Sequence, residues 1–341
     1  MSANSFRPVA ETDLENLIAR VQRQASFGAA GVFGPSSITW KINRESALFL
    51  AAGRAALLQL AHPWVAAALA QHSRTLADPI GRFHGTFGVV YSIIFGTLEQ
   101  AVAASRGLHQ LHSRIRGTLP QTAGVFPAGS SYEANEVAAL RWVYATLIDS
   151  AVFAYELVLT PLTSQEREAY YHESLLTAAL FGISHEELPP DWDGFQRYLA
   201  AMFEGGSISV SAIALPIAQQ LMVGAGSWVR PPLWYRALTA WSMPARLRHE
   251  FELPYEEREW RLVLRARRWL PRFYQALPGW LRFVGPYREA QQRLRGRQPS
   301  LPVRWSNRFW IGRPSLLAPS SGAKFASSRA NGGSSASLRS S

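Results

Sequence analysis

Hydrophobic residues recur at the three- and four-residue spacing of a helix along most of the chain, while clear runs of alternating β-branched residues do not occur. This pattern predicts an all-α fold, a single large multi-helix globular domain. The predicted helices cover residues 11–24, 43–60, 64–72, 80–95, 98–116, 132–159, 163–180, 192–203, 207–223, 255–276 and 279–295.

Residues with special backbone preferences set several of these boundaries. Pro63 ends the helix before it, because proline disfavours helical geometry in the preceding residue. Asp78 suits an N-cap and Pro79 a first helical position. Gly117 is predicted to terminate helix 98–116. The segment Thr163-Ser-Gln-Glu166 is a capping box, in which the hydroxyl and the carboxylate each accept a hydrogen bond from a free backbone N–H.

Three regions follow from the composition along the chain. Residues 1–10 are predicted to be a flexible N-terminus, and 11–312 to be one helical domain. Within that domain, 228–300 is rich in Trp, Pro and Arg. Residues 313–341 are mostly Ser, Ala and Gly, and too few large apolar groups remain to offset the entropy of ordering them. We therefore predict a disordered tail there.

The composition excludes several classes of site. The 341 residues contain no cysteine, which rules out disulfides, thiolate haem ligation, iron–sulfur clusters and covalent haem attachment. Acidic residues among the first 17 leave no signal-peptide pattern. The two most apolar stretches, 46–70 and 207–226, are interrupted by polar groups and are interpreted as buried core helices. The expected location is cytoplasmic, either free or peripheral at the inner face of the membrane.

The net charge of +11 is concentrated in the C-terminal third. From residue 229 onward there are 21 Lys and Arg against 6 Asp and Glu. Such asymmetry indicates either contact with an anionic partner or a solvated helix face with a basic tail. No recognised nucleic-acid motif occurs, so we expect no nucleic-acid partner. Basic amphipathic helices with tryptophan suit an anionic membrane surface, which makes 228–297 a candidate for membrane contact.

Histidine 112 is the principal candidate for chemistry. His109 and His112 are three residues apart and can share one helix face. A di-iron site would need Glu-x-x-His pairs, which the chain lacks, so a multi-ligand metal cage is disfavoured. A single histidine bound to haem iron needs no such set. The alternative, that His112 is an ordinary core or surface histidine, stays open.

Other polar residues in apolar segments are also candidates. Arg82 and Thr86 are four apart and share a face, where the arginine could bind a propionate, polarise oxygen or pair with Asp78. Arg54 lies in an apolar helix, so it must bond either a carboxylate or an anionic cofactor group. Tyr144 either lines a cavity, together with Asp149, or bonds across a helix pair. His62 and His72 each suit a structural or a ligating role.

Taken in order, these segments resemble the MpaB-type oxygenase family, which includes the catalytic domain of latex-clearing rubber oxygenases. The resemblance spans 31–171. It rests on the motifs Gly31-Val-Phe-Gly-Pro35-Ser-Ser-Ile-Thr-Trp40, Asn43-Arg-Glu45, Arg54-Ala-Ala-Leu-Leu-Gln-Leu-Ala-His62-Pro, His72-Ser, Asp78-Pro-Ile-Gly-Arg82 with Thr86, His112-Ser-Arg-Ile-Arg116-Gly, Trp142-Val-Tyr-Ala-Thr-Leu-Ile-Asp149-Ser and Pro161-Leu-Thr-Ser-Gln-Glu-Arg-Glu168-Ala-Tyr170-Tyr.

The resemblance implies a helical fold around a non-covalent haem b. It assigns the axial iron ligand to His112, with Arg116 beside it, and the distal residues to Arg82 and Thr86. Cofactor contacts are expected from Arg54, His62, Tyr144 and Arg116. Two positions depart from the family. Gly85 replaces a lysine that can occupy the distal iron position, so an open or water-bound sixth site is expected. Tyr144 stands where relatives often have histidine.

The predicted function is therefore a haem-b-dependent oxygenase that uses dioxygen on an apolar, unsaturated, small or lipid-like substrate. Oxidative cleavage of a carbon–carbon double bond is the outcome best known for the family, while hydroxylase and peroxidase-like reactions fit the same residues. The alternative is a haem- or lipid-binding protein without turnover, peripheral to the membrane.

Overall fold

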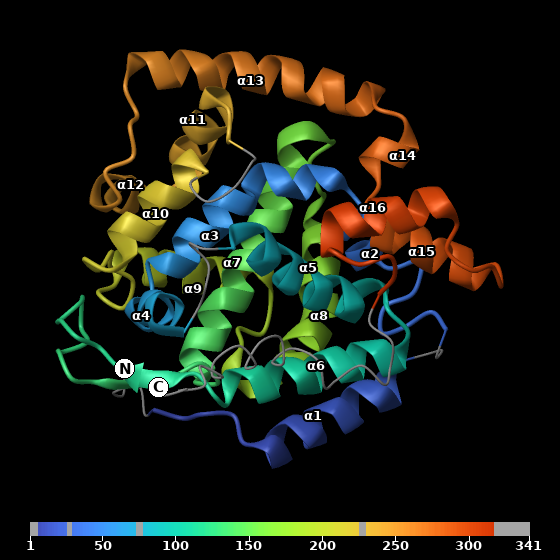
Figure 1. The fold of residues 1–341 in the computed structure, drawn as a ribbon, viewed down its shortest axis with the longest axis horizontal. Coiled ribbons are helices and arrows are strands. Elements are labelled where there is room, and N and C mark those ends of the chain that lie inside the picture. Colours follow the sequence, from blue (N-terminus) through green and yellow to red (C-terminus); the bar gives the residue numbers. More distant parts are fainter. Residues whose placement is uncertain (1–5, 26–28, 73–77, 225–229, 317–341) are drawn as a thin grey trace, which may run out of the picture.

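The computed structural model describes residues 6–25, 29–72, 78–224 and 230–316. Within these ranges the fold is almost entirely helical, as predicted, with one short antiparallel hairpin (Figure 1). The elements are α1 Glu11–Gln24, α2 Ile38–Asn43, the 3-10 helix η1 Ser46–Ala51, α3 Ala52–Leu60, α4 Pro63–His72, α5 Pro79–Phe95, α6 Leu98–His112, β1 Arg116–Thr118, β2 Ser131–Glu133, α7 Val137–Val158, α8 Ser164–Leu180, the 3-10 helix η2 His185–Glu187, α9 Trp192–Glu204, α10 Ala214–Val223, α11 Leu233–Ser242, α12 Ala245–Glu250, α13 Glu257–Ala276, α14 Gly279–Arg282, α15 Gly285–Leu294 and α16 Leu301–Ile311.

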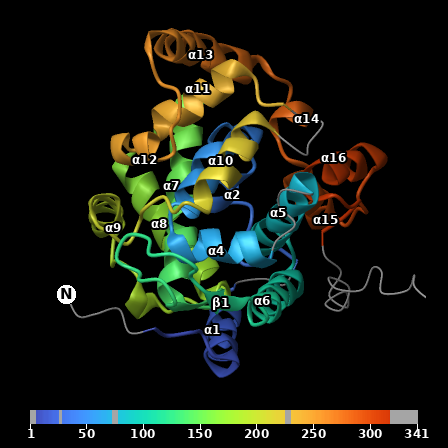
Figure 2. The same ribbon diagram turned by 60° about the vertical axis from the view of Figure 1, so that its left-hand side comes forward.

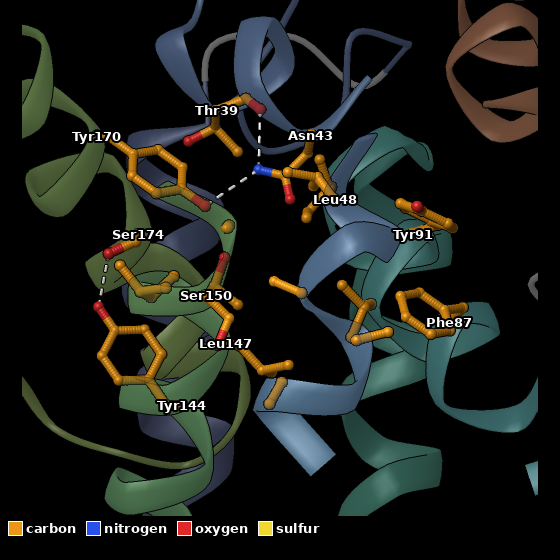
Figure 3. A pocket seen from close by; sticks show the side chains of 18 of the residues that line it. Thr39, Asn43, Leu48, Phe87, Tyr91, Tyr144, Leu147, Ser150, Tyr170 and Ser174 are labelled. Atoms are coloured by element: carbon orange, nitrogen blue, oxygen red, sulfur yellow. Dashed lines mark hydrogen bonds between the residues drawn. The ribbon is translucent and has the colours of Figure 1, made fainter. Parts of the chain in front are cut away.

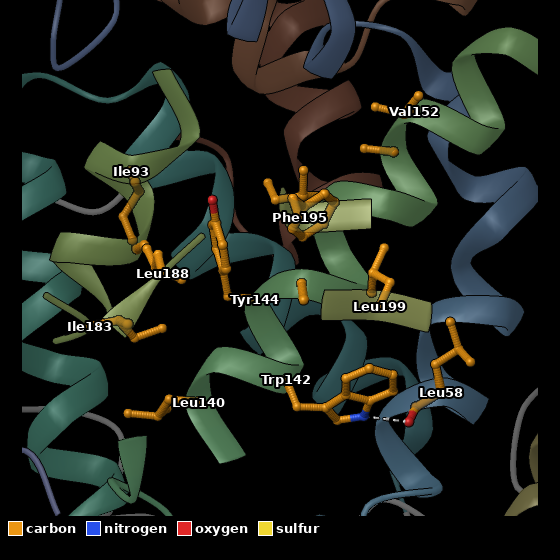
Figure 4. Close-up of a cluster of buried hydrophobic side chains, with 14 of the residues drawn as sticks. Leu58, Ile93, Leu140, Trp142, Tyr144, Val152, Ile183, Leu188, Phe195 and Leu199 are labelled. Atoms are coloured by element: carbon orange, nitrogen blue, oxygen red, sulfur yellow. Dashed lines mark hydrogen bonds between the residues drawn. The ribbon is translucent and has the colours of Figure 1, made fainter. Parts of the chain in front are cut away.

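Helix α7 runs through the middle of the molecule and packs against η1, α3, α8 and α13. Its large side chains join the main hydrophobic core shown in Figure 4. The fully buried Trp142 donates from Nε1 to the carbonyl of Leu58 at 2.8 Å, so its one polar group is satisfied inside the core. Among the described residues α7 alone is long and apolar enough to cross a membrane, and 67% of its apolar window is buried inside the protein.

Helices α5 and α6 form a hairpin. Asp78 caps α5 by accepting from the N–H of Gly81 at 2.8 Å, and Thr97 opens α6 with a capping box. Gly96 and Thr97 form the turn of this hairpin. Arg82 lies 14 residues before Gly96, and His112 lies 15 residues after Thr97. Both are therefore roughly 21 Å along their helices from the turn, and they meet at the open end of the hairpin.

The predicted helix 98–116 is wrong at its C-terminal end. Helix α6 ends at His112, and Arg116 begins β1, which pairs with β2. Gly117 is not a helix stop. It lies opposite Tyr132, and a Cβ on it would come within 2.7 Å of the Tyr132 hydroxyl. The glycine thus permits the close approach of the strands. The sequence did not indicate this role, because no strand was predicted at this position.

The predicted helix 43–60 is broken, because α2 ends at Asn43 and η1 begins at Ser46. The break holds the buried Glu45, whose carboxylate accepts from Arg282 at 2.7 Å and from the Tyr274 hydroxyl at 2.9 Å. Backbone pairing of Glu45 with Phe283 also splits the predicted helix 279–295 into α14 and α15. Tertiary contacts from distant sequence therefore override both helical patterns.

Further differences lie nearer the chain ends. Helix α10 begins at Ala214, later than predicted, and α11, α12 and α16 were not predicted. Of the N-terminal segment, Val9 is buried and its N–H bonds the carbonyl of Asn135 at 2.9 Å. At the other end Leu316 is buried, and its N–H bonds the carboxylate of Glu289. The rest of the predicted tail, and Trp228 at the start of the basic region, lie outside the described residues.

Candidate functional site

His112 ends α6 in an environment that keeps its imidazole neutral. Its Nδ1 atom is buried and has no hydrogen-bond partner in the described part of the chain. Burial lowers the pKa of His112 to about 4, helped by the positive charge of Arg82 and by His109. The effect of Arg82 on the pKa of His112 agrees with the hairpin geometry, which places both residues at the same distance along their helices from the turn. A neutral imidazole with a free nitrogen is the form that binds a metal.

Arg82 lies on the first turns of α5. It keeps more than a third of its surface exposed, yet desolvation by the surrounding protein lowers its pKa. The guanidinium is therefore partly surrounded by protein and partly open to solvent. The carboxylate of Asp78 is bonded to the N–H of Gly81, and no ion pair of Arg82 is found within the described ranges. The expected pairing with Asp78 is therefore not the arrangement in the structure.

The positions next to Arg82 on α5 are Gly85 and Thr86. A Cβ on Gly85 would meet no atom within 4 Å, so this side of the helix is open space. The Thr86 hydroxyl donates to the carbonyl of Arg82 at 3.2 Å, a bond that fixes its proton and leaves its oxygen able to accept. The open position is the one at which the resemblance assigns lysine to rubber oxygenases.

The remaining candidate histidines have protein partners. His109 donates from Nε2 to the carbonyl of Val9 at 3.0 Å, and His72 donates likewise to Arg116 at 3.0 Å. His62 is buried among aromatic rings, accepts from the N–H of Trp64 at 3.3 Å, and has its pKa lowered to about 4 by burial. No group of three or more metal-binding side chains occurs in the described ranges.

Arg54, by contrast, is bound on every side by protein. It pairs with Asp149 at 2.5 Å, donates to the Ser150 hydroxyl at 2.8 Å and to the Ser242 carbonyl at 3.1 Å, and lies over the ring of Phe153. Of the two partners expected for this buried charge, a carboxylate or a cofactor, the structure shows the carboxylate. The carboxylate of Asp149 is engaged in the same ion pair.

A cavity lies between α2, η1, α3, α5, α7 and α8, and its space for water-sized molecules is about 90 Å³ (Figure 3). Its walls are mostly apolar. Tyr144 contacts it and bonds the Ser174 hydroxyl at 2.5 Å, and burial raises the pKa of Tyr144. On another wall Asn43 donates to the Tyr170 hydroxyl at 3.3 Å. Both interpretations of Tyr144 therefore hold together, since it lines a cavity and bonds across a helix pair.

Sequence reasoning missed most of the polar groups around this cavity. Tyr170, Ser174 and Thr177 all line it from α8, and their spacing of four and three places them on one helix face. That spacing was the available signal. The hydroxyl of Tyr91, which also lines the cavity, is buried with no partner in the described part of the chain.

Arg116 is placed differently from the expectation. It lies on β1, is exposed, and follows a turn after α6, so it does not share a helix with His112. The structure thus groups His112 with Arg82, and with Gly85 and Thr86 one turn further along α5, whereas Arg54 is paired with Asp149. Chemically, the first group offers a neutral nitrogen ligand, a cation and a hydroxyl next to open space.

Comparison with known families identifies the domain that contains these residues. A family model described as ER-bound oxygenase mpaB/B′/rubber oxygenase, catalytic domain, matches residues 40–272. That stretch contains the α5–α6 hairpin and the cavity. No curated protein and no solved structure matched the chain. Because the family model covers more than half of the sequence, this protein belongs to the mpaB/B′ and rubber oxygenase family and carries an oxygenase domain.

Proposed function

We propose that this protein is a haem-b-dependent oxygenase that acts on an apolar, unsaturated small molecule. One observation carries the proposal: the neutral His112, whose buried Nδ1 has no hydrogen-bond partner in the described ranges, lies near Arg82, a cation without a carboxylate partner there. In a chain without cysteine, imidazole is the natural axial ligand for a non-covalent haem. The oxygenase family supports the reaction class.

The donor set fits such a group. His112 would hold the iron through an imidazole nitrogen, and Arg82 is a charge complement for a propionate or for an oxygen species. When bound, haem supplies the binding and activation of dioxygen. The open side of α5 at Gly85 leaves room near Thr86. We propose no cofactor contact for Arg54, because its charge is already neutralised by Asp149.

The chain's own residues have defined tasks in this account. Arg82 stabilises negative charge that develops beside it, because its guanidinium donates strong charge-assisted hydrogen bonds. Thr86 accepts a hydrogen bond near the same point, because its own proton is donated to the carbonyl of Arg82. His112 stays neutral at physiological pH and needs no deprotonation before it binds metal. Tyr144 and the apolar wall of the cavity exclude water and favour an apolar substrate.

The cavity also sets a requirement. Ligand pockets for small molecules usually enclose roughly 300–1,000 Å³. The space for water-sized molecules here is about 90 Å³. Side chains of α5 and α7 must therefore move apart when a larger group enters, and binding should be accompanied by a change in tertiary packing.

Oxygen uptake tests the catalytic part of the proposal. Haem-reconstituted wild type should consume dioxygen when a long-chain alkene is added, and labelled dioxygen should appear in carbonyl products if the double bond is cleaved. Arg82→Met should lower kcat roughly 100- to 1,000-fold, the usual effect of removing a charge-stabilising donor. Arg23→Gln, an exposed arginine on α1, is the control and should retain full activity.

A second candidate function is binding of haem or a lipid-like molecule without turnover. The mostly apolar lining of the cavity favours it, since such walls hold a ligand without acting on it. Stable haem binding with no alkene-dependent oxygen uptake would select this alternative and refute the oxygenase proposal.

A further inference from the structure

Helix α13 is the outermost layer on one side of the molecule. It forms the upper edge in both Figure 1 and Figure 2, which are related by a turn about the vertical axis. Its inner face packs Val263, Ala266, Leu270 and Tyr274 against the protein, with α11 beneath it. The outer face is therefore presented to the surroundings along the full 20 residues.

Five arginines form a stripe along this outer face. They follow one another at spacings of three and four residues, opposite the buried stripe, and all are exposed: Arg258, Arg261, Arg265, Arg268 and Arg272. The two glutamates of α13 lie in its first turn, where Glu257 pairs with Arg261 at 2.7 Å. The rest of the helix carries no acidic residue. The stripe is thus a row of positive charge about 21 Å long with little internal neutralisation.

Large apolar side chains stand beside the arginines at the C-terminal end. Phe273 is 57% exposed, and on α14 Trp280 and Leu281 are 62% and 46% exposed. Trp269 is 39% exposed and packs edge-on against Trp234, so it is held in a fixed position. Exposed groups of this size gathered in one place mark an interaction site.

We propose that the outer face of α13 and α14, defined by these five arginines with Trp269, Phe273, Trp280 and Leu281, docks on an anionic lipid membrane. The arginines complement lipid phosphates, and the aromatic groups suit the boundary between headgroups and acyl chains. A nucleic acid would satisfy the arginines and leave Leu281 and Phe273 in water. The membrane is the partner that accounts for both kinds of side chain. This inference does not depend on haem binding.

Flotation of the full-length protein with vesicles tests the proposal. Wild type should float with phosphatidylcholine vesicles that contain phosphatidylglycerol, and less with pure phosphatidylcholine. High salt should weaken the binding. Arg265→Gln combined with Arg272→Gln should reduce partitioning roughly thirtyfold, because each arginine near an anionic surface contributes about a fivefold factor. The matched control, Arg23→Gln with Arg197→Gln, removes two exposed arginines from other helices and should leave binding unchanged.

The apolar part of the surface needs its own variant. Trp280→Ser should weaken vesicle binding at every salt concentration without changing the helical circular dichroism. Failure of the wild type to bind anionic vesicles at low salt would overturn the proposal. So would an equal loss in the Arg23 and Arg197 control, which would mean that only net charge matters. Tight binding of a single-stranded oligonucleotide that displaces the vesicles and is indifferent to Trp280→Ser would assign the surface to nucleic acid instead.

Discussion

Arg54 on α3 and Arg82 on α5 are two arginines that differ in whether their charge is paired within the protein. Arg54 is buried, pairs with Asp149 and donates to Ser150 and Ser242. Arg82 lies at the open end of the α5–α6 hairpin, near His112, without a carboxylate partner in the described residues. A charge satisfied by protein holds the fold together. A charge held without a partner is available to a ligand.

The largest expected effect separates the two residues by stability. Arg54→Met leaves Asp149 without its partner and should cost about 3–5 kcal/mol in the free energy of unfolding. Arg82→Met should cost less than about 1 kcal/mol, because Arg82 has no ion pair with any of the described residues. Urea denaturation measures both. The double variant Arg54→Met, Asp149→Leu should recover part of the loss, and a large loss from Arg82→Met would contradict the comparison.

Acid should weaken the fold through the buried His62. Burial lowers its pKa from 6.5 to about 4 in the folded protein. As the pH falls below 6.5, His62 becomes protonated in the unfolded chain but stays neutral in the folded protein. The contribution of His62 to stability is therefore fully present above pH 6.5 and is lost as the pH falls toward about 4. The shift corresponds to about 3 kcal/mol. His62→Gln should flatten this decline in denaturation measurements, and an unchanged pH dependence would refute the assignment.

A smaller effect tests the cavity wall. Tyr144→Phe removes a hydroxyl that bonds Ser174 at 2.5 Å, while Ser174 still donates to the carbonyl of Tyr171. The expected cost is about 1 kcal/mol, the usual net value of one hydrogen bond. Tyr170→Phe, which loses a longer bond of 3.3 Å to Asn43, is the matched variant and should cost less. Equal or reversed costs would argue against the geometry of Figure 3.

The smallest effect tests whether Arg82 and His112 face each other. Removing the cation by Arg82→Met should raise the pKa of His112, since the positive charge disfavours the imidazolium. The pKa should stay below 6.5, because burial is the larger cause. Histidine NMR titration of the haem-free protein measures it. Arg114→Met, a nearby exposed residue, should leave the pKa unchanged.

Much of this architecture could be read from local sequence. Helix α1 has the predicted bounds, and the caps at Asp78 and Thr163 are formed as expected, because capping depends on residues within one turn. The motifs around Arg82 and His112, which indicated the family, are also short local segments and could be recognised from sequence. The break at Glu45 and the β1–β2 hairpin could not be predicted in this way. The first depends on Arg282, and the second on the pairing of β1 with β2 across a loop.

The candidate site divides in the same way. His112 and Arg82 stand at matched distances from one turn, and Thr86 lies one helical turn from Arg82, so a helical pattern was enough to bring them together. The partner of Arg54 lies 95 residues away, on α7, and periodicity could not select it from the other carboxylates. The cavity depends on side chains from six elements, and its volume is a property of packing alone. Charged positions could thus be found from sequence, but their partners could not.

The most direct test of the central claim is the absorption spectrum of purified, haem-reconstituted protein, with a pyridine haemochrome assay, for wild type and His112→Ala. The account predicts a Soret band and one haem b per wild-type chain, and a lost or strongly shifted band in the variant, with circular dichroism confirming that the variant is folded. Haem bound with an unchanged spectrum in His112→Ala, or no haem bound by wild type, would contradict it.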